Sequence, residues 1–362
     1  MSDLPARGVP ARSATLEDVA RVAGVSRSTV SRVVNDVRNV DSALRETVRL
    51  AIEATGYVPN SAARSLVTRR AGAIALVVSA TAGKATTGER FPYQVFTDPF
   101  FGRVVSGAVG VLHPLGMYPL LMLADTARAR DHVVGHLRRG SADGALVVST
   151  LPDDPLPALL VEAGVPAVLY ARPATPMRIS YVDLANHDGA RLAADHLVAL
   201  GCSNVALITG PEDVLAAQER STGFVVAMAR HGHPYVPAAD GDFTAIGGER
   251  AMARLLAEHP YTEGVFAAND RMAQGALVAL RAAGRNVPGD VSVIGFDDGS
   301  AAIAAQPALT TVRQPVEDMA AEMTRMLLAH IEDPERPPSS VIFEPTLVVR
   351  ESTRSTAKPT VD

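Results

Sequence analysis

"TLEDVARVAGVSRSTVSRVVN" occupies residues 15–35 of a 362-residue chain and contains two short runs with the apolar spacing of a helix. Thr15 and Asp18 have the spacing of a capping box, in which a hydroxyl and an acid three residues later each accept a backbone N–H. Gly24 supplies a turn between the runs, and Ser26 is placed to cap a second helix. The stretch therefore predicts two helices joined by a tight turn.

A third apolar run follows, which we expect to begin at a Ser42 cap and to end at Gly56. In the second helix, Val30, Val33 and Val34 face inward. Polar side chains of that helix face outward, namely Arg27, Ser28, Ser31 and Arg32. Three short helices around one small core predict a helix-turn-helix, whose second helix enters the major groove of DNA. An ordinary helical hairpin with a solvated polar face is the alternative.

The outward side chains suit contact with nucleic acid. Arginine can donate two hydrogen bonds to O6 and N7 of guanine. The hydroxyls of Ser26, Thr29 and Ser31 can donate to phosphates, which sets the register without reading sequence. Residues 1–70 contain 11 Arg against seven acids, whereas the remainder has 23 basic and 32 acidic residues. A basic head on an acidic body indicates an anionic partner at the head.

The segment "GYVPNSAARSLVTRR", residues 56–70, allows one further helix of about two turns, capped by Asn60. Helices this short are unstable alone in water, so we expect a partner to order it. Leu66 fits an apolar wedge between base steps of the minor groove, or alternatively packs on the third helix.

Residues 15–66 resemble the DNA-binding head and hinge of the lac/galactose repressor family. The resemblance rests on three stretches: the opening one at residues 15–35, "GYVPN" and "AARSL". The resemblance implies that Arg27, Ser28 and Arg32 read bases. It also implies that Tyr57 and Asn60 flank a hinge helix and that Leu66 intercalates at the centre of a pseudo-palindromic operator.

From Ala73 onward, near-continuous apolar strands alternate with helices, which predicts parallel sheets covered on both faces. A faint internal repeat indicates two doubly wound lobes with a ligand between them, at the carboxyl ends of the strands. This α/β two-lobed core is similar to periplasmic sugar-binding proteins and to the regulatory core of the family, through "DHLVALG", "GFDD" and "PALTTVRQP". The expected boundaries are a helix-turn-helix domain at 13–58, a hinge at 59–71, a first lobe at 72–173 plus about 302–332, a second lobe at 174–301 plus about 333–351, and a tail at 352–362.

Polar side chains follow several of the predicted strands and could bind an effector in the cleft. Carboxylates, amides and arginine suit polyols, since each hydroxyl is both donor and acceptor. Aromatic rings could stack on the apolar face of a sugar or on a base. The candidates are Arg220 at the start of a helix, Asp297, Phe243, Asn269, Phe101, Phe100, Asp270, Asp183 and Arg172. Phe101 could instead belong to the core, and Asp270 could be only a helix cap.

The sequence argues against catalysis and membrane insertion. It has no phosphate-binding loop, nucleophile elbow or long apolar span, and the chain begins without an apolar signal region. A single cysteine, Cys202, excludes an intrachain disulfide. We expect a cytoplasmic protein that is not an enzyme and requires no metal or cofactor.

The sequence as a whole predicts a homodimeric repressor that binds operator DNA and is released by a sugar-like inducer. The tail lacks the leucine heptad with which the family forms tetramers. A corepressor-type regulator that binds a purine or nucleoside is the alternative, and a solute-binding protein of the same fold is a more distant one.

Overall fold

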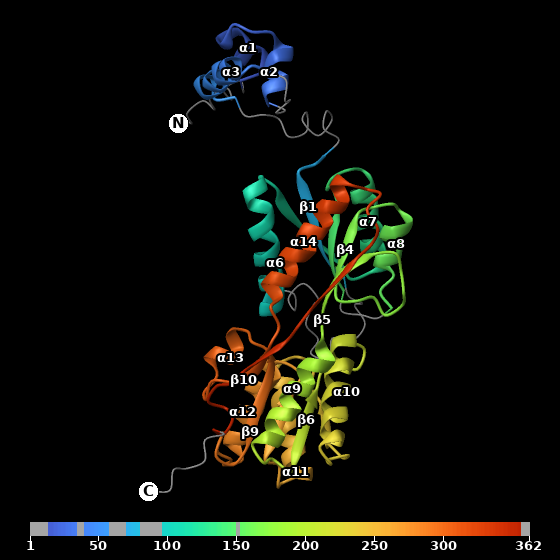
Figure 1. Cartoon of the computed structure of the whole chain (residues 1–362), viewed down its shortest axis with the longest axis vertical. Coiled ribbons are helices and arrows are strands. Elements are labelled where there is room, and N and C mark those ends of the chain that lie inside the picture. The colour runs from blue at the N-terminus through green and yellow to red at the C-terminus, as the bar shows by residue number, and fades with distance from the viewer. Residues whose placement is uncertain (1–13, 35–39, 58–69, 80–95, 150–152, 356–362) are drawn as a thin grey trace, which may run out of the picture. The chain divides into compact units, whose positions relative to one another are not determined.

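The computed structural model describes residues 14–34, 40–57, 70–79, 96–149 and 153–355. The chain forms two compact units, residues 1–72 and residues 73–362. In the first unit, the head, helices α1 (Leu16–Ala23), α2 (Arg27–Val34) and α3 (Ser42–Thr55) enclose a small core (Figure 1). The buried residues of that core are Val19, Ala20, Val30, Val48 and Ala51.

Helix caps in the head follow the sequence prediction with one exception. Thr15 and Asp18 form the capping box of α1, and Gly24 ends that helix in the left-handed conformation with a φ of 66°. Ser26 Oγ accepts the backbone N–H of Thr29 at 3.2 Å and so caps α2. The expected Ser42 cap is wrong. Asp41 caps α3, because its carboxylate accepts the backbone N–H groups of Ala43 and Leu44.

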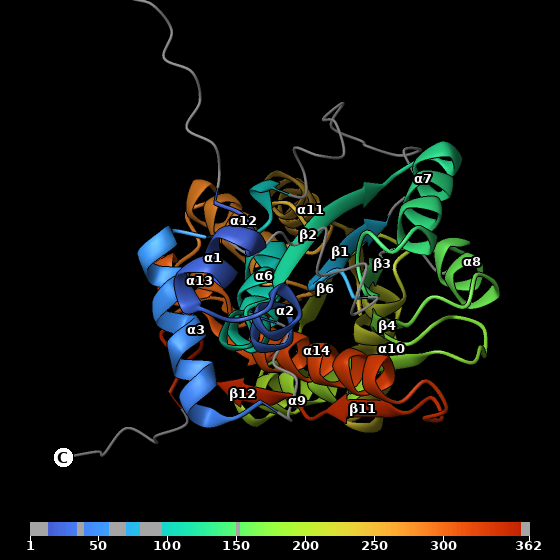
Figure 2. The ribbon, with the colours of Figure 1, turned by 90° about the horizontal axis from the view of Figure 1, so that it is seen from above.

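The second unit, the core, has two α/β lobes, each with a six-stranded sheet between helices (Figure 1). The N-lobe sheet has the order β11-β5-β4-β3-β1-β2, and all of its neighbouring strands are parallel. Helices α6 and α14 cover one face of the sheet, and α7 and α8 cover the other. Figure 2 shows the long α14 beside α6 and α7 beside α8. The N-lobe elements are β1 (Ala73–Ser79), α6 (Pro99–Leu112) with a 3₁₀ turn (His113–Leu115), β2 (Tyr118–Ala124), α7 (Ala127–Arg138), β3 (Ala145–Ser149), α8 (Leu156–Glu162), β4 (Ala167–Tyr170), β5 (Ser180–Leu184), α14 (Val316–Glu332) and β11 (Ser340–Phe343).

The C-lobe sheet has the order β12-β10-β9-β8-β6-β7, in which β12 alone among these described strands is antiparallel to its neighbour. Helices α9 and α10 cover one face, and α11 and α12 cover the other. Glycines permit the close approach of α11 and α12: a Cβ at Gly275 would lie 1.9 Å from the carbonyl oxygen of Ala245. The C-lobe elements are α9 (Asn186–Ala199), β6 (Val205–Thr209), α10 (Leu215–Arg230), β7 (Ala238–Asp240), α11 (Ala245–Glu258), β8 (Gly264–Ala267), α12 (Asp270–Ala282), β9 (Ser292–Asp297), α13 (Ser300–Ala304), β10 (Thr310–Arg313) and β12 (Thr346–Val348).

The backbone crosses between the lobes three times, after β5, after β10 and after β11. These crossings correct the lobe boundaries that we expected from the sequence. β5 pairs with β4 and belongs to the N-lobe, although residues from 174 were assigned to the second lobe. β10 pairs with β9 in the C-lobe, and β11 pairs with β5 in the N-lobe, again opposite to the expectation. The physical reason is that strand pairing between distant segments has no local sequence signal.

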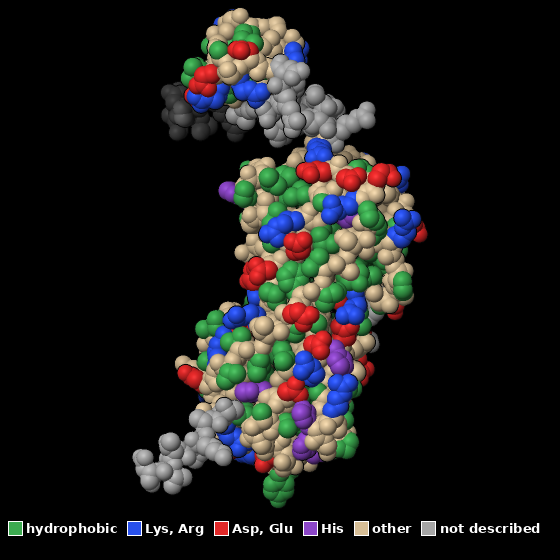
Figure 3. All heavy atoms as spheres, in the orientation of Figure 1, with side chains coloured by type: hydrophobic (Ala, Val, Ile, Leu, Met, Phe, Trp, Pro, Cys, Tyr) green, Lys and Arg blue, Asp and Glu red, His purple; other side chains and the backbone are tan. Residues whose placement is uncertain are grey.

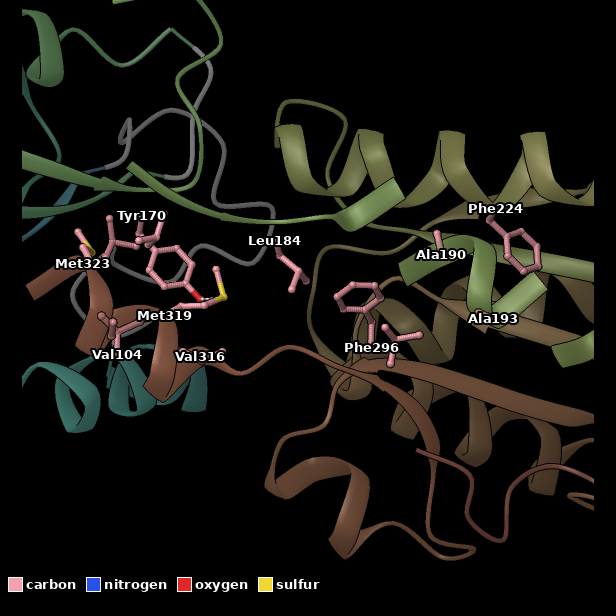
Figure 4. Packing of buried hydrophobic residues seen from close by; sticks show 14 of the residues in the cluster. Val104, Tyr170, Leu184, Ala190, Ala193, Phe224, Phe296, Val316, Met319 and Met323 are labelled. Atoms are coloured by element: carbon pink, nitrogen blue, oxygen red, sulfur yellow. Dashed lines mark hydrogen bonds between the residues drawn. The ribbon is translucent and has the colours of Figure 1, made fainter. Parts of the chain in front are cut away.

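One hydrophobic cluster runs through both lobes (Figure 4). On the N-lobe side, Val104 and Met319 pack near Tyr170. On the C-lobe side, the Phe266 ring contacts both Phe224 and Phe296, with ring centroids 4.9 Å and 6.5 Å apart. Leu184 lies between the two groups, at the first crossing of the chain. Because the lobes share this buried seam, a change in their relative orientation must repack it.

Charged residues are interspersed over the face of the core seen in Figure 3, with acids and bases side by side. Among the described residues, no helix has the length and apolar character needed to cross a bilayer.

Candidate functional sites

The first candidate site is the outward face of α2 in the head. Ser26, Arg27, Ser28 and Arg32 are exposed, and Thr29 and Ser31 are half-buried. The Ser26 hydroxyl is hydrogen-bonded to those of Ser28 at 2.8 Å and Thr29 at 2.9 Å. The first turn of the helix therefore presents a row of ordered hydroxyls beside a guanidinium.

Arg27 is a strongly exposed charge on this face, with 69% of its side chain accessible to solvent. Its Nε lies 3.0 Å from a carboxylate oxygen of Glu17 in α1. An exposed ion pair of this kind contributes at most about 1 kcal/mol, so the guanidinium can leave it for a stronger acceptor. Tyr57 is half-buried against the head core. Asn60 and Leu66 lie outside the described residues.

The second candidate site is a cleft between the two lobes of the core, with a volume of about 260 Å³. That volume is close to the lower limit of roughly 300 Å³ common for small-ligand sites. All nine residues that the sequence predicted for an effector line the cleft: Phe100, Phe101, Arg172, Asp183, Arg220, Phe243, Asn269, Asp270 and Asp297.

Arg220 is the centre of the buried polar network at this cleft. It lies in the second turn of α10, not at the start of a helix as expected, since that helix begins at Leu215. Its guanidinium donates to three side chains and to one backbone carbonyl, and it stacks 3.7 Å from the centroid of the Phe296 ring. The acceptors are Asn186 Oδ1 at 2.9 Å, Ala268 O at 2.8 Å, Asp297 Oδ1 at 3.3 Å and Gln314 Oε1 at 3.0 Å.

Asp297 ends β9 in an unusual backbone conformation, with a φ of 109°. Such a φ is costly for a residue with a side chain, and fixed partners must maintain it. The carbonyl oxygen of Asp297 accepts from Arg103 Nη1 at 3.0 Å and from the Gln314 N–H at 3.4 Å. A quarter of its side chain remains exposed to the cleft. Burial raises the pKa of this carboxyl to about 6, and the positive charge of Arg220 opposes the rise.

Asn269 and Asp270 follow β8 and have separate roles. Asn269, not Asp270, is the cap of α12: its Oδ1 accepts the Met272 N–H at 2.8 Å, and its amide donates to the Phe243 carbonyl at 3.1 Å. Asp270 is almost fully buried and accepts the Thr311 hydroxyl at 2.6 Å and the Gly299 N–H at 2.8 Å. Burial raises the pKa of Asp270, and the nearby negative charge of Asp297 raises it further.

Aromatic rings form part of the cleft wall. Phe100 makes edge contacts with Phe101 and with Tyr170, with ring centroids 5.3 Å and 5.2 Å apart. Phe101 is half-buried, so it both packs against the core cluster and lines the cleft. Phe243 adopts a φ of 62°, and a Cβ on Gly210 would lie 2.4 Å from its ring, so a glycine is required there.

The structure adds lining residues that sequence reasoning did not select. Gln314 joins Arg220 to the Tyr170 hydroxyl, and Arg103 joins the lobes by bonding carbonyls of Asp297 and Gln314 while pairing with Glu317. Asp98 caps α6 and lies 3.8 Å from Arg271 of α12. Two of these residues lay within recognised fragments, "DPFF" and "PALTTVRQP", and could have been selected there. Arg103 and Arg271 carry no such sequence signal.

Comparisons with known proteins agree with both halves of this architecture. Residues 15–60 match the model of bacterial regulatory proteins of the lacI family, and residues 194–353 match that of a periplasmic binding protein-like domain. The HTH-type transcriptional regulator CelR of Thermobifida fusca is 42% identical over 345 residues, which is 94% of this chain and 98% of that protein. The HTH-type transcriptional regulator GalR of Escherichia coli is 31% identical over 347 residues, covering 94% of this chain and 95% of its own.

Two solved structures extend the comparison to three dimensions. A CelR–cellobiose complex has 40% sequence identity and a TM-score of 0.71, covering 94% of this chain and 99% of the other. The lac repressor dimer bound to operator and the anti-inducer ONPF has 26% identity and a TM-score of 0.80, covering 95% and 100%.

Proposed function

The chain belongs to the lacI family of bacterial regulatory proteins, and we propose that it is a repressor whose affinity for operator DNA is controlled by a sugar bound in its core. The observation that carries this proposal is the presence in one chain of an exposed reading helix and a cleft built from polyol-binding side chains. Its similarity to regulators over 94% of its length supports the same function.

On the DNA side, α2 enters the major groove, where Arg27, Ser28 and Arg32 contact base edges. Ser26, Thr29 and Ser31 donate to phosphates and fix the register of the helix. Two chains pair as a homodimer, because a pseudo-palindromic operator presents two half-sites related by a two-fold axis. Tyr57 and Asn60 flank the hinge, and Leu66 intercalates between base pairs at the operator centre.

On the ligand side, the polar residues of the cleft bind sugar hydroxyls and the rings stack on the apolar face of the sugar. Arg220 and Asp297 are the principal contacts, followed by Phe243 and Asn269, and the remaining ligand residues are Phe100, Phe101, Asp183, Asp270 and Arg172. The sugar bound in the CelR complex supports a sugar as the effector class.

Ligand binding in the cleft can be coupled to DNA binding through Arg103, which connects the two lobes. This α6 side chain bonds the carbonyl of Asp297, whose carboxylate we propose as a ligand contact, so a ligand that moves Asp297 also moves the N-lobe. A short hinge helix of the kind that the sequence predicts would be marginally stable alone, and therefore sensitive to small changes in the core. A coupling free energy of about 1–3 kcal/mol changes operator affinity about 5–150-fold. We expect the sugar to weaken operator binding, as an inducer does.

A regulator of this kind acts where the chromosome lies, so we place it in the cytoplasm. The cleft binds its ligand without transforming it, and the protein is not an enzyme. Incubation of the protein with candidate sugars, followed by chromatography, checks this directly: recovery of unchanged sugar is expected, and product formation contradicts it.

Operator selection followed by a binding titration tests the whole proposal. The full chain is incubated with a random duplex library, the enriched sequence is labelled, and its affinity is measured by fluorescence anisotropy with and without sugars. We expect a palindromic consensus and a weaker complex in the presence of one sugar. Absence of any enriched sequence contradicts the regulator, and a nucleoside or purine that tightens the complex identifies the corepressor alternative instead.

A further inference from the structure

The arginines of the cleft are distinctive because each of them is already paired with a carboxylate. Among the described lining residues, the basic side chains are Arg103, Arg172, Arg220 and Arg271, with no lysine or histidine. Arg103 makes a bidentate pair with Glu317, with N–O distances of 2.8 Å and 2.7 Å. The other three pair with Asp183 at 2.5 Å, Asp297 at 3.3 Å and Asp98 at 3.8 Å, respectively.

The surrounding acids leave no excess of positive charge. Arg172 has a second acidic neighbour in Glu219 at 3.5 Å. Asp154, which also lines the cleft, is paired with the buried Arg130 at 3.1 Å. Asp270 is held by hydrogen bonds from Thr311 and Gly299 without an arginine in contact. The described wall is therefore neutral to slightly negative.

We propose that this cleft is charge-matched to an uncharged sugar and excludes phosphorylated and carboxylated ones. This inference rests on the proposed function, because it specifies the ligand of the same cleft. A phosphate placed beside one of these arginines also faces its carboxylate. At similar distances, the repulsion between the phosphate and that carboxylate offsets the attraction between the phosphate and the arginine.

Hydrogen-bonding capacity points the same way. Asp297 uses Oδ1 to accept from Arg220, and no described side chain donates to its Oδ2, although the side chain is a quarter exposed. A sugar hydroxyl can donate to this oxygen, whereas the fully ionised phosphate group of a sugar phosphate or a carboxylate group brings only acceptors.

Helix N-termini are the usual alternative binding site for an anion. At this cleft, Asp98 accepts the Phe100 N–H of α6, and Asn269 accepts the Met272 N–H of α12, so both termini are occupied. The first turns of α9 and α10 have no side-chain cap, and Asn186 and Val214 at their starts line the cleft. If an anion does bind in the cleft, these turns are where it should be found.

The chain offers a substitution that removes a carboxylate with little structural change. Asp98→Asn leaves Arg271 without its acid, while asparagine caps a helix as well as aspartate does. Asp188→Asn is the matched control, since Asp188 is exposed in the first turn of α9 and is absent from the described cleft wall.

The experiment compares ligands in uncharged and charged pairs. Calorimetric titrations of the full chain use glucose with glucose 6-phosphate, cellobiose with cellobionate, adenosine with adenosine monophosphate, and inorganic phosphate alone, all at one ionic strength set with sodium chloride. We expect that in any pair that binds, the charged member binds at least 100-fold more weakly. We also expect Asp98→Asn to bind inorganic phosphate and glucose 6-phosphate at least fivefold more tightly than the wild type, and Asp188→Asn to match the wild type.

Each outcome decides one of the two proposals. A charged member that binds as tightly as its uncharged partner overturns the charge-matching proposal, as does an Asp98→Asn variant with no gain for phosphate. Binding of adenosine but of no sugar refutes the sugar effector, while exclusion of its phosphate still supports charge matching. If no organic probe binds, the phosphate comparison between wild type and Asp98→Asn alone decides.

Discussion

The reading helix of the head and the cleft of the core place arginine in opposite environments. Arg27 exposes 69% of its side chain and pairs with one glutamate of the adjacent helix. Arg220 exposes 6% and donates to four acceptors that come from separate parts of the chain. An exposed arginine is available to a large anionic partner, whereas a buried, paired one holds the side chains around it in place and can be reached only by a small ligand that enters the cleft. The same residue type therefore serves two kinds of recognition.

The largest effect should come from breaking the buried arrangement. Arg220→Ala leaves Asn186, Asp297 and Gln314 without their donor, and loss of one partner of a buried ion pair costs about 3–5 kcal/mol. Denaturant unfolding followed by circular dichroism should show that loss, and ligand binding should be abolished. Arg254→Ala removes an exposed pair with Glu258 and should leave the unfolding midpoint almost unchanged, because solvent screens such a pair. Equal effects of the two substitutions would show that burial does not distinguish them.

On the exposed side, Arg27→Ala should weaken binding to the selected operator by about 1–3 kcal/mol and leave the unfolding transition unchanged. The reason is that Arg27 contributes to a contact with DNA and little to the head core. Anisotropy titrations measure the first quantity and thermal unfolding the second. Arg49→Ala is the control, because Arg49 is an exposed arginine of the head that lies on α3 between Glu46 and Glu53. A selective loss with Arg49→Ala would relocate the reading face.

The pH dependence of ligand binding gives a further test of the buried site, because the raised pKa of Asp297 lies close to neutral pH. Its raised pKa of about 6 means that the ligand-binding carboxylate is neutralised below that pH. Effector affinity should therefore fall about tenfold between pH 7 and pH 5, because about one molecule in ten remains ionised at pH 5. The groups that face this carboxylate and shape its titration are Arg220, Asp98, Arg103 and the buried Asp270.

The stability of the ligand-free core should respond to the same group with the opposite sign. A carboxyl whose pKa is higher in the folded state stabilises the fold at low pH, and that contribution is lost as pH rises through about 6. Calorimetric affinity and denaturant unfolding, both measured from pH 5 to pH 8, report the two trends. Asp297→Asn should flatten the affinity trend and weaken the stability trend, part of which persists because the pKa of the buried Asp270 is raised as well. A variant that retains the affinity trend would assign that trend to another group.

The smallest effect concerns the head alone. Asp41→Ala removes two hydrogen bonds at the start of α3 and should destabilise the head by about 1 kcal/mol. Hydrogen exchange of the Ala43 and Leu44 amides should accelerate, while the core amides stay protected. Asp41→Ser should restore protection, since serine also caps. Unchanged exchange in the alanine variant would return the cap to Ser42.

Much of the head could be predicted because its determinants are local. The capping box of Thr15 and Asp18, the turn at Gly24 and the Ser26 cap all join residues within a few positions of each other, and all three are confirmed. Strands and helices of the core were likewise recognisable from runs of apolar residues. Even so, a choice between adjacent caps, Asp41 or Ser42, depended on backbone conformation.

The sequence by itself determined three features: a reading helix in the head, parallel sheets covered by helices in the core, and the cleft residues at the strand ends. Only the tertiary structure decided which lobe each strand joins, because β5, β10 and β11 pair with strands that no local pattern specifies. It also decided the partners of Arg220, which come from positions 34 to 94 residues away along the chain. Contacts between residues so far apart along the chain form only when the sheets and helices have packed together, and the residues next to each partner in the sequence do not specify that packing.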